Sequence, residues 1–180
     1  MKKILLSFLI LTLLLAAVGW LRYGGGENYP DLTTTALLGE DALEEVLSYP
    51  EPIGNLAVSA DGRLFFTVHP EARPRGNRLL EYVDGASVPF PDVGSQLDLF
   101  DTVLGIAIDQ QNRLWTIDHG NHGLQAPRLL AFDLDKNEII RDQRLPPEIA
   151  PAGSFLQDLQ ISADGRTVII ADASIWRLQP

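Results

Sequence analysis

The sequence predicts an all-β protein, a partial β-propeller of about two and a half to three four-stranded blades that follows an N-terminal hydrophobic helix. The first observation is a repeat: GNLAVSADGRLFF at residues 54–66 returns as LGIAIDQQNRLWT from Leu104 and as DLQISADGRTVII from Asp158. The second is that each unit contains short apolar runs joined by turn residues, such as Ala60-Asp61-Gly62. Units of about 50 residues with about four antiparallel strands are typical of propeller blades, because only neighbouring sheets cover the two apolar faces of each sheet.

Residues 1–23 form an apolar leader. Lys2 and Lys3 precede an uncharged run from Ile4 to Leu21, which is long enough to span a hydrocarbon core of ~30 Å. The leader is predicted to be either a transmembrane signal-anchor or a cleaved signal peptide. In both cases the lysines stay in the cytoplasm, so the rest of the chain is predicted to be extracytoplasmic. It is then secreted, periplasmic or anchored in the inner membrane by this helix.

Residues 24–41, which begin with a run of glycines, are predicted to be a flexible tether, and residues 42–180 the propeller. For residues 36–49 both a helix and a strand are possible predictions, because the apolar residues have helical spacing but the segment runs into two prolines.

The first repeat predicts strands at 56–58, 64–68, 78–83 and 88–90. A small β-sandwich explains short strands, but it does not explain why Arg63 and Arg78 both recur, as Arg113 and Arg128, at the same offset.

Composition excludes several classes of partner and chemistry. The chain has 24 Asp and Glu against 14 Lys and Arg, a formal net charge of −10. Such a surface repels nucleic acid and anionic lipid, so the membrane is a partner only through an uncleaved leader. There is no cysteine, which excludes disulfides, thiol catalysis and zinc-thiolate sites.

The phrases LWTIDHG, PRLLAFDL and FLQDL follow one another in this order. Together with the repeated turn phrase, they resemble the bacterial members of the major royal jelly protein and yellow family over residues 42–180. The resemblance implies export and a six-bladed β-propeller, distantly related to gluconolactonase-like proteins. Six such units need about 300 residues, so the chain resembles the N-terminal half of such a protein. A truncated gene product is the expectation, and the alternative is that two arcs close on each other by self-association through the open propeller face.

In a propeller the first residues of each innermost strand point towards a common axis. These positions are Asn55, Gly105 and Asp158, with Gln157 beside the last. Amide and carboxylate oxygens suit a hard cation, so Asn55 and Asp158 are candidate ligands for Ca²⁺. The lactonase relatives imply a metal there as well, although Gly54 stands where they carry a glutamate.

Two aspartates and a histidine complete the candidate ligand-binding residues. Asp118 and Asp172 end the second strands of their repeats, where they either bind ligand or accept backbone N–H bonds in the following turn. His69 and His119 are equivalent in the repeat, which is interpreted as a blade-to-blade hydrogen bond, with His119 kept as a candidate ligand residue. No catalytic residue is identified.

The sequence therefore favours an exported module that binds a small molecule or an envelope protein. The alternative is an enzyme of the metal-dependent lactonase or dopachrome-converting type, in which a cation at the propeller axis polarises a carbonyl oxygen.

Overall fold

The computed structural model describes residues 2–24, 30–31, 34–35 and 38–174. The chain divides into two compact units, Met1–Glu44 and Glu45–Pro180. The first unit contains helix α1 (Lys2–Tyr23) and a single 3₁₀ turn, η1 (Glu40–Ala42). Helix α1 has a mean hydropathy of 2.6 and, within the described residues, is the one helix long and apolar enough to cross a bilayer, as a signal sequence also is. In the stretch that left helix and strand open, residues 38–49 contain η1 and no strand, while residues 36 and 37 lie outside the described part.

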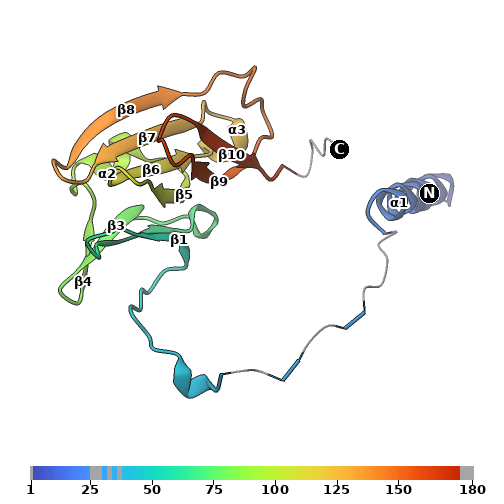
Figure 1. The fold of residues 1–180 in the computed structure, drawn as a ribbon. Helices are drawn as coiled ribbons and strands as arrows, with labels where there is room; N and C mark the ends of the chain where they lie inside the picture. Colours follow the sequence, from blue (N-terminus) through green and yellow to red (C-terminus); the bar gives the residue numbers. More distant parts are fainter. Residues whose placement is uncertain (1, 25–29, 32–33, 36–37, 175–180) are drawn as a thin grey trace. The chain divides into compact units, whose positions relative to one another are not determined.

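The second unit consists of three antiparallel sheets, each paired in chain order (Figure 1). Sheet A contains β1 (Ile53–Val58), β2 (Leu64–Val68), β3 (Leu79–Val83) and β4 (Ala86–Pro89). Sheet B contains β5 (Val103–Ile108), β6 (Arg113–Asp118), β7 (Arg128–Asp133) and β8 (Glu138–Arg144). The described part of sheet C contains β9 (Leu156–Ile161) and β10 (Val168–Asp172). The strands predicted for the first repeat are present, with ends shifted by at most three residues.

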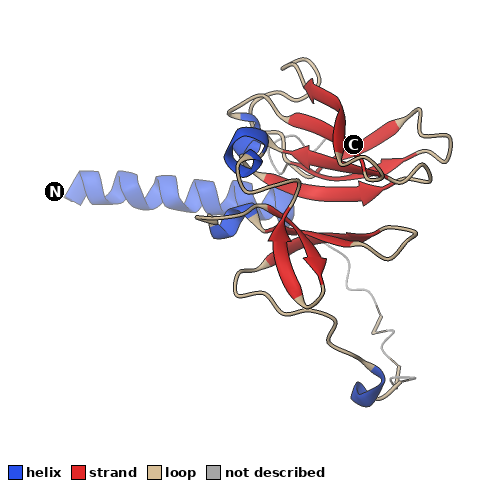
Figure 2. Cartoon of the chain, turned by 90° about the vertical axis from the view of Figure 1, so that its left-hand side faces the viewer, coloured by secondary structure: helices blue, strands red, loops and turns tan. Residues whose placement is uncertain are grey.

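The sheets are arranged as successive blades, and the first strand of each sheet is its innermost strand. Strand β1 contacts β5, and β5 contacts β9, so the innermost strands lie side by side. Figure 2 shows the strands of different sheets as separate layers. The fold is therefore a partial β-propeller, as the repeat predicted. Three short helical turns lie in the loops: η2 (Pro70–Ala72), α2 (Ser95–Leu99) and α3 (Gly120–Gly123).

Side chains alternate between the two neighbouring sheets along each innermost strand. Ile106 of β5 packs against Phe65 and Leu79 of sheet A, whereas Ala107 packs in a second cluster with Leu159 of sheet C. We call the face turned to the preceding sheet the leading face and the face turned to the following sheet the trailing face. Two apolar clusters, one at each junction, therefore hold the three sheets together.

Arginines after the first hairpin turns fasten each sheet to the next. Arg63 forms a fork with Glu81 of its own sheet, with N–O distances of 2.7 and 3.0 Å, and donates to Leu134 O of the following sheet at 2.7 Å. Arg113 is held by Asp109 at 2.6 Å and donates to Gly165 O of sheet C at 3.2 Å. Because each guanidinium has several donors in a fixed plane, it can satisfy an acid and a neighbouring carbonyl at once.

The identical SADGR pentapeptides do not adopt the same hairpin. In sheet A the turn closes with Ser59 N donating to Arg63 O, but in sheet C Ser162 N donates to Thr167 O, one residue further on. Thr167 therefore holds the position of Arg63, and the partner of Leu64 in the repeat is Val168. This shift aligns Asp118 with Asp172 and Trp115 with Ile169.

Candidate functional site

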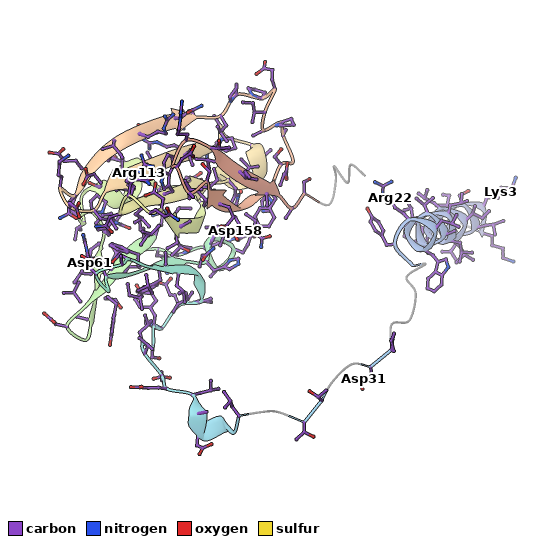
Figure 3. The ribbon with its side chains drawn as sticks, in the orientation of Figure 1. Lys3, Arg22, Asp31, Asp61, Arg113 and Asp158 are labelled. Carbon is purple, nitrogen blue, oxygen red and sulfur yellow. The ribbon has the colours of Figure 1, made fainter. Side chains whose placement is uncertain are left out.

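The candidate site lies where loops of consecutive sheets emerge at the same end of the arc, which we call the loop face. The loops after β2 and β6 and the segments that lead into β5 and β9 meet at this end. Asp118 binds Asp101 N, and His122 contacts both Glu71 and Phe155. Asp158, near the start of β9, lies at this end, whereas Asp61, in the turn after β1, lies at the other (Figure 3).

Asp118 organises the loop face. Its side chain is 3% exposed, and its carboxylate accepts bonds from Asp101 N at 2.6 Å, Thr102 N at 2.9 Å and Thr102 Oγ1 at 2.8 Å. Gly120 N donates a fourth bond at 2.9 Å. The carboxylate thus joins the segment before β5 to the loop after β6. Of the two roles that the sequence left open for Asp118, the acceptance of backbone N–H bonds is the one observed.

Asp172 makes the equivalent bonds in sheet C. Its Oδ1 accepts from Phe155 N at 2.8 Å and from Ser174 N at 3.0 Å. Both aspartates therefore bind backbone of their own sheet, and a contact of either with a ligand stays a prediction.

The two equivalent histidines cap short turns within their own sheets. Nδ1 of His69 accepts from Glu71 N at 3.3 Å, and Nδ1 of His119 accepts from His122 N at 3.0 Å. The interpretation of their recurrence as a blade-to-blade hydrogen bond is therefore wrong. They recur because the same side-chain acceptor terminates the second strand in both repeats.

The capping bond also fixes the protonation of His119. Because Nδ1 accepts a hydrogen bond, the neutral ring carries its proton on Nε2. The ring is 1% exposed, and burial lowers the pKa of His119 below its usual value. Nε2 has no hydrogen-bond partner among the described residues, so a buried donor is left unsatisfied.

Side chains from all three sheets surround this histidine. Phe155, before β9, packs against His119 with ring centroids 5.0 Å apart and against His122 at 4.7 Å. Nε2 of His122 lies 2.8 Å from the Glu71 carboxylate in the loop after β2. The cluster connects the loops of sheets A, B and C.

His119 lines a cavity of about 340 Å³ between the loops of sheets A and B. The cavity lining also includes the polar side chains of Glu71, Arg73, Arg78, Asp101 and Thr102. Arg78 donates to the carbonyl of Asp101 at 3.0 Å. The guanidinium of Arg73 has no bond to the described residues, so it is available to a bound molecule. The cavity is therefore lined by a buried histidine and by a cation that makes no hydrogen bond to the described residues.

The predicted axial residues form no recognisable metal centre within the described part of the chain. Asn55 Oδ1 accepts from Leu56 N at 2.7 Å, and Asp158 Oδ1 accepts from Leu159 N at 2.8 Å. A Cβ on Gly105 would lie 2.6 Å from Gln157 O and 2.9 Å from Asp158 Cα, so the inner strands approach closely here. In the part of the chain that the structure describes, no three His, Asp or Glu side chains converge on one point. The Ca²⁺ site at Asn55 and Asp158 stays a prediction.

Sequence reasoning identified His119 but none of the residues from other loops that surround it. Glu71, Arg73, Asp101 and Phe155 come from loops that lack the repeat, so periodicity could not bring them together. The sequence signal for these loop residues was the difference between the two repeats after the histidine. His69 is followed by PEAR, which contains Glu71 and Arg73, whereas His119 is followed by GNHG.

A partial β-propeller with a polar cavity among its loops is the class of protein that these features define. The sequence profile of the family "Major royal jelly protein" matches residues 101–178, which contain LWTIDHG, PRLLAFDL and FLQDL. The chain is 33% identical over 85 residues to "Major royal jelly protein 7" of Apis mellifera. That alignment covers 44% of this chain and 18% of the relative, so the chain spans less than a fifth of the relative's length.

Proposed function

We propose that this chain is an exported, royal jelly/yellow-like propeller protein that binds a small molecule in the cavity beside His119. The profile match and the partial identity with the honeybee protein support the family. The apolar helix α1 supports export, since a retained anchor and a cleaved leader both carry the propeller across the membrane.

The observation that carries the proposal is the unsatisfied Nε2–H of His119. A buried donor without a partner costs about 1–3 kcal/mol, and such groups are retained where a ligand or water completes them. His119 is one of the residues that line a cavity of about 340 Å³, which lies within the ordinary size range of ligand sites. A carbonyl or carboxylate oxygen of the ligand would accept the bond from His119.

The surrounding charges favour a ligand that presents one such oxygen and carries at most one negative charge. Arg73 adds attraction for a carboxylate, but Glu71 and Asp101 oppose an ion of higher charge. The Glu71 carboxylate already lies 2.8 Å from His122. The cavity is therefore suited to small neutral carbonyl compounds and monocarboxylates.

Two substitutions of His119 separate ligand binding from the turn. The His119→Asn amide oxygen can replace Nδ1 as the acceptor of the His122 N–H bond, but it removes the Nε2 donor. The His119→Gln amide nitrogen can replace the Nε2 donor, but it removes the cap. We expect benzoate and benzamide, titrated by saturation-transfer NMR against the full chain in detergent, to bind wild type and His119→Gln and to lose at least tenfold in affinity for His119→Asn. Equal binding by the two variants, or binding of neither probe to wild type, would refute the proposal.

The metal-dependent lactonase-like or dopachrome-converting enzyme remains the second hypothesis. It requires a cation near Asn55 and Asp158, and calorimetric titration of the full chain with calcium tests it. No heat at millimolar calcium would eliminate that mechanism.

A further inference from the structure

A second, smaller cavity of about 240 Å³ lies on the loop face, among residues of sheets A and B and of the segment that joins them. Three arginines from separate segments are part of its lining: Arg78 before β3, Arg128 at the start of β7 and Arg144 at the end of β8. The cavity is smaller than the sites that usually hold drug-sized ligands. Because guanidinium groups are typical partners of oxyanions, the cavity is a candidate site for a small anion.

The charge of Arg128 is already balanced within sheet B. Its Nε and Nη2 lie 2.8 and 2.7 Å from the two carboxylate oxygens of Asp142 on β8. Its Nη1 donates to the carbonyl oxygens of Asp98 and Leu99 at 2.9 and 3.1 Å. Arg128 is therefore held in a fixed position at the cavity.

Arg78 is the equivalent of Arg128 in the first repeat, but sheet A lacks the acid that pairs with it. In the register of the sheets, Pro89 of β4 stands where Asp142 stands on β8. Proline offers no carboxylate. The repeated arginine therefore has an ionic partner in sheet B and none in sheet A.

Arg78 binds only carbonyl oxygens among the described residues. Its Nε donates to Asp101 O at 3.0 Å and its Nη1 donates to Gly76 O at 3.3 Å, whereas its Nη2 makes no hydrogen bond to the described residues. The side chain is half-buried, and charges that are withdrawn from water are normally paired with an opposite charge. An anion in the cavity would supply that partner.

Arg144 adds a second guanidinium that forms no ion pair or hydrogen bond with the described residues. It pairs directly with Arg128 across β7 and β8, so both arginines lie on the leading face of sheet B. The pKa of Asp142 is lowered chiefly by its hydrogen bonds from Arg128 and to a smaller extent by the charge of Arg144. Because Arg144 is exposed, its long side chain can adjust to an ion.

Three aspartates also line the cavity and limit the charge of the ion that it can hold. The Asp118 carboxylate already accepts four hydrogen bonds. Asp98 and Asp101 are exposed and oppose a highly charged anion. The site therefore favours an ion of low charge and weak, salt-sensitive binding.

We infer that this cavity binds a phosphate group, held by Arg78 and Arg144 beside the fixed guanidinium of Arg128. Donors from three separate segments suit a tetrahedral oxyanion, whose oxygens point in several directions, better than they suit a planar carboxylate. The inference does not rest on the ligand proposed beside His119, although Arg78 lines both cavities.

Inorganic phosphate, titrated against the full chain in detergent and followed by phosphorus NMR at constant ionic strength, tests the inference. We expect millimolar binding that Arg144→Gln weakens by about tenfold or more, with an unchanged urea midpoint because the side chain is exposed. Arg78→Gln should weaken the binding as well. Arg141→Gln is the matched control and should bind like wild type. It removes the same charge from β8, but Arg141 pairs with Ala131, which packs towards sheet C.

Three further titrations sharpen the result. Asp98→Asn should bind phosphate more tightly, because it removes a like charge from the lining. Glycerol phosphate identifies the source of the group: tighter binding than that of inorganic phosphate indicates an organic monoester, and equal or weaker binding indicates the free ion. His119→Asn should bind phosphate like wild type, so the ligand proposal can fail without this one. Absence of phosphate binding to wild type, or equal affinities of Arg144→Gln and Arg141→Gln, would overturn the inference.

Discussion

Replacing Asp118 by asparagine should strongly destabilise the propeller. Asp118 is 3% exposed and accepts four hydrogen bonds, two of them from Asp101 N and Thr102 N at 2.6 and 2.9 Å. The Asp118→Asn side chain keeps one acceptor oxygen and turns an NH₂ group towards the remaining donors. About two charge-assisted bonds are lost, each contributing roughly 1.5–3 kcal/mol. The free energy of unfolding should therefore fall by about 3–6 kcal/mol.

Urea unfolding of the full chain in detergent, followed by the fluorescence of buried Trp115, measures this loss. Asp98→Asn is the matched control, because the Asp98 side chain is exposed and makes no bond to the described residues; its effect should stay within about 0.5 kcal/mol. If Asp118→Asn lost less than about 1 kcal/mol, the carboxylate would not organise the loop face as argued, and its role would have to be sought in a ligand.

Gly105→Ala should lower the free energy of unfolding by about 1–3 kcal/mol in the same assay, because the new Cβ would lie 2.6 Å from Gln157 O. Gly76→Ala should be neutral, because no atom lies within 4 Å of the new Cβ. Equal effects of the two substitutions would contradict the close approach of the strands at Gly105. His119 has a folded-state pKa lowered from 6.5, so the unfolded chain binds more protons and the free energy of unfolding should fall as pH drops below 6.5 until the folded pKa is passed. His119→Asn should remove that part of the pH dependence, which urea midpoints between pH 7.5 and about 5 would reveal. Asp158→Asn should abolish any calcium binding measured by calorimetry while the urea midpoint stays constant; undiminished binding would place the cation elsewhere.

The repeat made the architecture predictable because it reports the requirement that neighbouring sheets cover each other. Ala60-Asp61-Gly62 forms the expected hairpin, and Gly62 has the positive φ, 89°, that the turn requires. The same reasoning could not detect that the third hairpin takes one more residue, because Ser162 to Arg166 spells the same five letters as the first. Register there is set by the pairing of Val168 with Ile161, which no local pattern reveals.

The site was less predictable than the fold. His119 was found because it recurs, but its role was misread, since a repeated side chain can cap its own turn as readily as it can bridge two sheets. The cavity combines that histidine with Arg73 and Asp101 from irregular loops. Their proximity follows from the stacking of the sheets, so it appears only after the arc is built.

The central place of sheet B has a consequence for local opening. Its two faces contact apolar clusters on both sides, and Leu114, Ile117 and Leu130 are almost fully buried. In a stacked array where each unit touches only its neighbours, the middle unit opens only when both junctions fail. The amides of β6 should be the last to exchange with deuterium, and either end of the arc can fray without releasing them.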